Sequence, residues 1–224
     1  MLRSTDWCRR ENGMISGIIT AAGKGERMKA DMRRRGFRPV HKLLLRLNDE
    51  TVIEKTINNV LKAGVDECIV VVGCQKDEII PKISDMDVKI VENPNFRIPL
   101  TGSLLNGIKN AKGGICLCVA GDQPTVTPKT YKKIIGNLKG YKTISIMGRG
   151  VFGRLDNPKG LGMPFAAHKK LLLEYLPSYK GNINPLLWKM LKNNIKLYAV
   201  KPENEIELVN LNTYDHYLKI KSGN

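Results

Sequence analysis

Short apolar runs separated by amphipathic segments restrict the folds open to this chain. The runs Cys68–Val72 and Ile115–Ala120 are apolar at every position, and Ile15–Thr20 opens the series. Strands of a parallel sheet have this composition because helices cover both of its faces. Between the first two runs, apolar residues in 52–61 recur at helical spacing and stop before Gly64. The pattern predicts an α/β protein with a mainly parallel sheet.

The alternation continues toward the C-terminal end, and 224 residues suit one domain. Glycine and proline crowd residues 148–164, which indicates tight turns in place of a regular element. Further strands are expected at 88–91, 143–147, 165–167, 196–200 and 206–209, and further helices at 103–110, 128–138, 168–176, 185–192 and 213–221.

The chain is strongly basic, with 37 Lys and Arg against 21 Asp and Glu and a formal charge of +16. This charge attracts anionic partners, although a lysine-rich proteome explains it equally well. Aromatic residues make up only 6% and no stacking motif stands out, which argues against a nucleic-acid partner.

The expected compartment is the cytoplasm. No apolar stretch approaches the ~18 residues that span a bilayer, and residues 1–14 are too polar for a signal peptide, so no membrane partner is expected. The five cysteines are odd in number and no pair has metal-site spacing, which indicates a reducing environment. Cys116 and Cys118 lie in an apolar run and are expected to be buried.

A glycine-rich basic connection follows the first expected strand. Gly23 and Gly25 let the backbone bend closely round a ligand, and Lys24 and Arg27 add positive charge to its N–H groups. The connection fits a phosphate chain, but it is neither Gly-x-Gly-x-x-Gly nor a P-loop, because a third glycine and Gly-Lys-Ser/Thr are both missing. We treat Ala21–Lys42 as one long loop.

Further basic residues crowd the same loop. It is either a mobile solvated segment or a clamp for an anionic acceptor, because like charges at this density repel one another unless they are screened. In the second interpretation Arg34, Arg35 and Arg38 bind the acceptor. His41 is a further candidate for substrate contact, and Lys42 is anchored by the apolar residues that follow it.

Asp122 follows the apolar run 115–120, at the carboxyl end of a buried strand, where open α/β sheets bind ligands. One carboxylate and one amide oxygen, such as that of Asn210 or Asn212, suffice for Mg²⁺, which completes its coordination with water and phosphates. The alternative is structural: Asp122 caps the turn before Pro124, and Asn212 caps the following helix.

Several separated motifs together resemble the molybdenum cofactor cytidylyltransferase and guanylyltransferase-like family, within the nucleotide-diphospho-sugar transferase fold. In chain order the matching segments are Met14–Met28, Lys42–Leu44, Asn93–Asn95, Thr101–Gly107, Gly121–Pro124, Gly162–Pro164 and Asn210–Thr213. The resemblance implies a three-layer α/β/α Rossmann-like nucleotidyltransferase fold with a mostly parallel mixed sheet over residues 14–224. Residues 1–13 match nothing and are expected to be a disordered extension.

The family activity implied by the resemblance is nucleotidyl transfer: a phosphate of the acceptor attacks the α-phosphorus of an NTP, and pyrophosphate leaves. Such chemistry depends mainly on positioning and charge neutralisation. The start Thr20–Gly23 is similar to the cytidylyl branch, so CTP is expected first and GTP second. The expected partners are this NTP and an anionic phosphorylated molecule of the molybdopterin type, with a monomer or weak homodimer as the oligomeric state.

The resemblance also implies roles for single residues. Lys24 and Arg27 would hold the β- and γ-phosphates, and Lys42 would contact the α-phosphate. Asp122 would bind Mg²⁺ or Mn²⁺ together with Asn210, or with Asn212 as the second choice. The other nucleotide contacts would be Ala21, Ala22, Gly23, Gly25, Gly73, Thr101, Gly102 and Ser103, and the acceptor loop would contribute Gly162 and Pro164.

Three departures from the family pattern qualify these roles. Asn210 and Asn212 stand where cytidylyl members usually carry Asp, so weaker metal binding or a different acceptor is expected. The segment between Met28 and Lys42 is longer and more basic than usual, and Asn182–Pro185 replaces a Gly-Ala-Arg-like stretch. Three alternatives stay open: a sugar-, polyol- or alcohol-phosphate acceptor, nucleotide binding without catalysis, and a basic nucleic-acid-binding protein.

Overall fold

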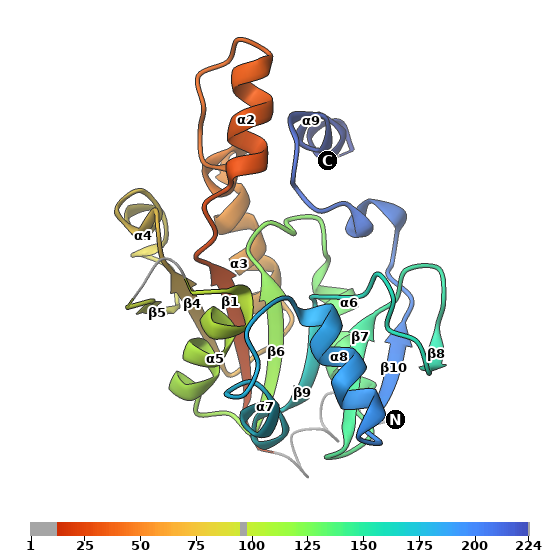
Figure 1. Ribbon diagram of the computed structural model, residues 1–224. Helices are drawn as coiled ribbons and strands as arrows, with labels where there is room; N and C mark the ends of the chain where they lie inside the picture. Colours follow the sequence, from red (N-terminus) through yellow and green to blue (C-terminus); the bar gives the residue numbers. More distant parts are fainter. Residues whose placement is uncertain (1–12, 95–97, 224) are drawn as a thin grey trace.

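The computed structural model describes residues 13–94 and 98–223, and an eight-stranded mixed sheet lies at its centre (Figure 1). The order is β5-β4-β1-β6-β9-β7-β10-β8, with β9 antiparallel to both neighbours and β8 antiparallel to β10. The strands are β1 (Ile15–Ala21), β4 (Glu67–Val72), β5 (Lys89–Glu92), β6 (Ile115–Ala120), β7 (Thr143–Met147), β8 (Gly153–Leu155), β9 (Phe165–His168) and β10 (Lys196–Val200). The short strands β2 (Arg46–Leu47) and β3 (Glu50–Thr51) form a separate antiparallel pair.

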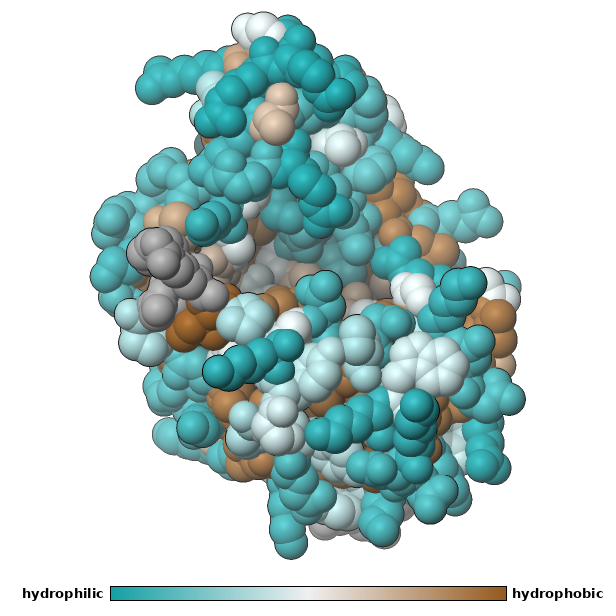
Figure 2. Space-filling model, in the orientation of Figure 1, coloured by the Kyte–Doolittle hydropathy of each residue, from teal (hydrophilic) through white to brown (hydrophobic). Residues whose placement is uncertain are grey.

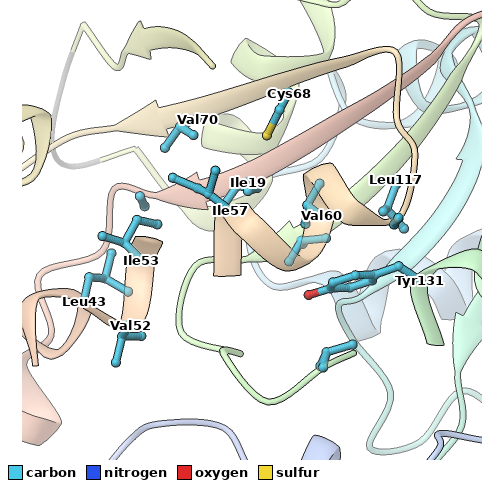
Figure 3. Close-up of a cluster of buried hydrophobic side chains, with 14 of the residues drawn as sticks. Ile19, Leu43, Val52, Ile53, Ile57, Val60, Cys68, Val70, Leu117 and Tyr131 are labelled. Carbon is cyan, nitrogen blue, oxygen red and sulfur yellow. The ribbon is translucent and has the colours of Figure 1, made fainter. Parts of the chain in front are cut away.

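Alternate residues of β1 belong to two different cores because successive strand side chains point to opposite faces of the sheet. Ile19 packs in a core with residues of α3 (Val52–Lys62) and α6 (Pro128–Gly136). Figure 3 shows Ile57 and Val60 of α3 beside Ile19. Ile18 belongs to the opposite core. The predicted three-layer α/β/α fold with a mostly parallel mixed sheet is thereby confirmed.

The remaining helices are divided between the same two cores. The Ile18 core receives residues of α5 (Leu100–Asn110), α7 (Lys169–Tyr175) and α8 (Ile183–Lys192). The Ile19 core receives residues of α2 (Glu26–Arg34), α4 (Lys76–Ile83) and α9 (Tyr214–Ser222). In Figure 1, α2 and α9 lie beyond the carboxyl end of β1, and the two helices contact each other. They therefore extend the Ile19 core beyond the carboxyl ends of the strands.

Two expectations about local structure were wrong. The presumed loop Ala21–Lys42 contains α2, because Met28, Asp31 and Met32 fall on one face of a helix and are buried there. The expected strand Ile206–Val209 is instead the 3₁₀ helix η2 (Glu205–Leu208), which packs its partly buried apolar side chains against the Ile19 core.

The sequence did not predict several other local features. They are α4, which contains Pro81, together with β8 and the β2–β3 pair. The predicted N-terminal extension lies outside the described residues except for Gly13, and so do Cys8 and Asn95. In the part of the chain that is described, no helix combines the length and apolar character needed to cross a bilayer.

Candidate active site

The glycine-rich loop and Asp122 are neighbours because they follow adjacent parallel strands. Thr20 of β1 lies opposite Ala120 of β6, and Gly121 N–H donates to the Thr20 carbonyl at 3.0 Å. The Gly121 carbonyl in turn accepts a hydrogen bond from the Thr56 hydroxyl of α3 at 3.1 Å. The connection leading to Asp122 is thus held by both the sheet and a packed helix.

The loop ends at the N-terminus of α2. Gly25, at the N-cap, has φ +69°, a left-handed conformation that glycine adopts without steric cost, and no side chain caps this helix end. The N–H groups of a first helical turn and the helix dipole both favour an anion. The loop therefore leads into a helix end whose N–H groups favour an anion.

The buried His41 side chain is hydrogen-bonded to this loop. Its imidazole is 2% exposed, with Nε2 2.9 Å from the Gly23 carbonyl and Nδ1 accepting from Leu43 N–H at 3.4 Å. These contacts require the tautomer in which Nε2 carries the proton. Burial is the main cause that lowers the pKa of His41, and the nearby Lys29 and Lys42 act in the same direction. His41 is therefore a neutral structural tie, with both ring nitrogens occupied.

Lys42 and Asp122 form an ion pair across the site. Lys42 begins the 3₁₀ helix η1 (Lys42–Leu44), and the next residue, Leu43, is buried. The backbone of Lys42 is therefore held in place. The two side chains are only 16% and 17% exposed. A partly desolvated carboxylate is thereby neutralised by a cation at the point where the strands end.

A cavity of about 240 Å³ opens between the glycine loop and α5. Figure 2 shows the surface hollowed beneath α2. Ala22, Gly23 and Lys42 line one side, and Ile98 and Leu100 contribute apolar surface. Ser103, Asp122 and Met163 also line this cavity, which we call the loop pocket.

A second cavity of about 420 Å³ shares Asp122 and Met163 with the loop pocket. Two arginines, Arg27 and Arg149, line it. It also contains five side-chain amides and the Gly160–Met163 turn, and we call it the amide pocket. The amides are those of Gln123, Asn182, Asn184, Asn210 and Asn212. Asp122 lines both cavities and so lies where they meet.

The segment that carries Asn210 and Asn212 is docked directly on Asp122. Leu211 N–H donates to the Asp122 carbonyl at 3.2 Å, and the Leu211 side chain is fully buried. Asn210 Oδ1 accepts from Gln123 Nε2 at 3.0 Å and from Arg149 Nη2 at 3.4 Å. The oxygen proposed as a metal ligand therefore already has two donors.

The predicted nucleotide residues are not all in the loop pocket. Thr101 is buried, and its hydroxyl oxygen accepts from Gly181 N–H at 3.1 Å, which ties α5 to the 179–181 turn. Gly102 packs on Ile98, and a Cβ on Gly73 would lie 2.8 Å from Ala22 Cβ. Ser103 lines the pocket and accepts from Asn93 Nδ2 at 2.7 Å. Gly73 and Gly102 thus allow close packing around the pocket.

The predicted acceptor residues are divided as well. Gly162 lines the amide pocket, whereas Pro164 is buried behind it. Arg34 and Arg35 belong to a separate surface pocket between α2 and α9, where Arg34 pairs with Asp31 at 2.7 Å and Arg35 with Asp215 at 2.5 Å. Arg38 is exposed and lines neither pocket at Asp122. Arg35 thus joins α2 to α9, and none of the three arginines lines the two pockets at Asp122.

Asp31 is the centre of that junction. Its carboxylate is buried and accepts from Tyr214 N–H at 2.9 Å. This hydrogen bond, with Arg35 and Arg34 contributing, lowers the pKa of Asp31. Asp31 therefore links α2, which follows the glycine loop, to α9, which follows Asn212.

Sequence reasoning did not select Gln123 or Arg149. Gln123 belongs to the Gly121–Pro124 motif and is 1% exposed, so its place beside Asp122 was the available signal. Arg149 lies in a glycine-rich turn after β7 with no motif of its own. The strand order brings this turn to the 208–210 segment, where Arg149 Nη1 donates to the Leu208 carbonyl at 3.0 Å.

A model of the MobA-like NTP transferase domain matches residues 17–195 of this sequence. The chain belongs to the MobA-like NTP transferase domain family. It is also 51% identical to a nucleotidyl transferase from Methanothermobacter thermautotroptrophicus, with a TM-score of 0.91 over 94% of this chain and 97% of that one. The family resemblance deduced from the motifs is confirmed, as is the nucleotidyltransferase class at the level of the family.

Two further proteins are more distantly similar to this chain. The bifunctional protein GlmU of Synechococcus elongatus is 25% identical over 89% of this chain, which spans only 42% of the length of that relative. A Mycobacterium tuberculosis protein crystallised in complex with manganese is 19% identical, with a TM-score of 0.66 over 94% of this chain and the whole of that one. At this identity the second similarity shows the fold alone.

Proposed function

We propose that this MobA-like protein transfers a nucleoside monophosphate from an NTP to a phosphorylated small molecule and releases pyrophosphate. The observation that carries the proposal is the position of Asp122 between two pockets of different chemistry. One pocket lies against the glycine loop and Lys42, and the other contains Arg27 and Arg149. Such an arrangement suits a triphosphate on one side of a reacting centre and an anionic acceptor on the other.

The glycine loop and the α2 N-terminus would hold the β- and γ-phosphates, with Lys24 contributing charge. Arg27, in the first turn of α2, lines the amide pocket and would span the two substrates. Lys42 would leave Asp122 for the α-phosphate when the NTP binds, because the triphosphate carries more negative charge than one carboxylate. Negative charge that develops on the α-phosphate oxygens would then be neutralised by a group that is already in position.

The donor set fits a divalent cation of the magnesium type. Among the described residues no group of three or more His, Cys, Asp and Glu forms a complete metal site. Asp122 with one Asn oxygen suits Mg²⁺ or Mn²⁺, whose other ligands would be water and phosphate oxygens. When bound there, the cation would neutralise charge on the phosphates.

The base and the acceptor are the finer parts of the proposal. CTP is favoured over GTP because the Thr20–Gly23 start is similar to the cytidylyl branch, and an acceptor of the molybdopterin type is favoured by the family. A sugar-, polyol- or alcohol-phosphate acceptor is the second candidate. Hydroxyl groups of such an acceptor would find matching partners in the five amides of the amide pocket.

Pyrophosphate release with each of the four NTPs, with and without molybdopterin-type and sugar-phosphate acceptors, tests the proposal. We expect release only when an NTP, Mg²⁺ and one acceptor class are combined. Asp122→Ala serves as the inactive control. No release with any combination, from a folded protein that also fails to bind NTP, would refute nucleotidyl transfer.

A further inference from the structure

Arg149 is an exposed residue on the wall of the amide pocket, and its guanidinium group is oriented by two hydrogen bonds. Nη1 donates to the Leu208 carbonyl at 3.0 Å, and Nη2 to Asn210 Oδ1 at 3.4 Å. The turn beneath it is tightly packed, since a Cβ on Gly148 would lie 2.5 Å from the Val151 carbonyl oxygen. Both partners of the guanidinium are neutral, so its positive charge is oriented but not cancelled.

No carboxylate balances this charge in the described part of the chain. Arg149 belongs to none of the ion pairs found there, whereas Lys42, Lys76 and Lys133 each have an acidic partner. A guanidinium held at two nitrogens by neutral acceptors still has donors for a bidentate contact to phosphate.

Gln123 adds a second, independent sign of a ligand. Its amide nitrogen donates to the Met163 carbonyl at 2.9 Å and to Asn210 Oδ1 at 3.0 Å. Gln123 is 1% exposed and lines the amide pocket. Its Oε1 is buried and has no hydrogen-bond partner among the described residues. A buried amide oxygen without a donor costs free energy unless a water or a ligand O–H or N–H satisfies it.

We propose that Arg149, oriented by Asn210, receives the phosphate of the acceptor, and that Gln123 Oε1 accepts a hydrogen bond from an adjacent hydroxyl or N–H of the same molecule. The acceptor is then a phosphate monoester with a hydrogen-bond donor close to its phosphate. Asn210 is a positioning residue for Arg149. Asn212 is then the amide that would bind the divalent cation together with Asp122. This inference rests on the proposed nucleotidyl transfer.

Asn210→Asp separates this role from that of a metal ligand, because the two roles predict opposite results. A carboxylate at position 210 would pair with Arg149 and draw its charge away from the acceptor phosphate. If Asn210 were instead a metal ligand, the same change would strengthen cation binding.

Inorganic phosphate serves as the probe for the acceptor site. It is titrated by calorimetry into protein that is saturated with a non-hydrolysable CTP or GTP analogue and with Mn²⁺. Mn²⁺ affinity is measured separately by electron paramagnetic resonance.

We expect Arg149→Gln and Asn210→Asp each to weaken phosphate binding about tenfold or more, because one charge-assisted bidentate contact is lost. Mn²⁺ affinity should stay within about twofold in both variants, whereas Asn212→Ala should weaken it about tenfold. Arg154→Gln, which removes an exposed arginine of β8, is the matched control and should change neither value.

Two results would overturn the inference. One is tighter Mn²⁺ binding in Asn210→Asp with unchanged phosphate affinity, and the other is unchanged phosphate affinity in Arg149→Gln. Either would leave nucleotidyl transfer intact, because nucleotide and metal would still bind. Wild-type protein that binds neither nucleotide nor Mn²⁺ would instead refute the proposed function, and this inference with it.

Discussion

Lys42 and Asp122 are 80 residues apart in the chain and form an ion pair at the junction of the two pockets. Each belongs to a separately anchored segment: Lys42 begins η1, and Asp122 follows β6 and receives the Leu211 N–H on its carbonyl. The pair keeps a largely buried carboxylate neutralised, and in the proposed reaction a more highly charged ligand replaces one partner.

This relationship predicts that the two residues act as a unit in catalysis. We expect Asp122→Asn and Lys42→Met each to lower kcat/KM for the NTP about 10²–10³-fold, since each removes charge stabilisation at the reacting phosphate. In the double variant the fold-loss in kcat/KM should be much smaller than the product of the two single fold-losses. Steady-state pyrophosphate release measures all three, with Lys76→Met, from an exposed ion pair with Glu92, as the control. Full additivity of the two losses would contradict the prediction.

Gly73→Ala should disturb the glycine loop from behind. The new Cβ would lie 2.8 Å from Ala22 Cβ and 3.0 Å from the Ala22 carbonyl oxygen, so the backbone of the loop must shift. We expect a loss of about 1–3 kcal/mol in the free energy of unfolding, measured by urea denaturation, together with weaker NTP binding. Gly23→Ala is the control for stability, because nothing lies within 4 Å of its added Cβ. Equal stability of the two variants would argue against this contact.

His41 predicts a loss of stability in mild acid. Because burial lowers the pKa of His41 in the folded protein, the unfolded chain binds more protons below the ordinary histidine value of 6.5. The contribution of His41 to the free energy of unfolding is therefore complete above pH 6.5, and it is lost as the pH falls toward the lowered pKa of His41.

Thermal unfolding from pH 8 to pH 5 measures this effect. His41→Gln should flatten the part of the profile below pH 6.5. His168, whose pKa is also lowered by burial, supplies the comparison variant His168→Gln, which should keep the His41 contribution. A His41→Gln profile parallel to that of the wild type would contradict the assignment.

The cysteines should differ sharply in reactivity. Burial raises the pKa of the Cys68 and Cys116 thiols to about 12 and that of Cys118 well above its ordinary value, whereas Cys74 is exposed. Iodoacetamide attacks the thiolate, so we expect Cys74 to be labelled in native protein and the three buried cysteines only after unfolding. Peptide mass spectrometry resolves the four sites, and rapid native labelling of Cys116 would contradict the buried state.

The sequence predicted the sheet well where burial leaves a continuous apolar run. The runs at 68–72 and 115–120 lie in the interior strands β4 and β6, whose side chains are buried on both faces of the sheet. It failed at α2, whose buried face contains Asp31 as well as Met28 and Met32. A carboxylate that is buried because it binds Tyr214 N–H looks like a surface residue in the sequence.

The candidate site divides in the same way. Lys42, Asp122 and the glycine loop were identified from motifs, because each lies directly after or before an apolar anchor in the chain. Arg149 belongs to no motif and could not be found this way. The motif contains Gln123 but does not reveal its role, since its partners at Met163 and Asn210 come from other parts of the chain. Motif order identified the family but not the contacts between motifs.

The sequence alone determined the parallel α/β architecture, the family and the loop that suits a triphosphate, because these depend on local periodicity and on residues close together in the chain. Only the tertiary structure decided that Arg35 joins α2 to α9, that His41 is a neutral tie and that Asn210 accepts a hydrogen bond from Arg149. The physical reason is that charge and hydrogen-bond partners are selected by strand order and helix packing, which bring together side chains that no sequence spacing relates.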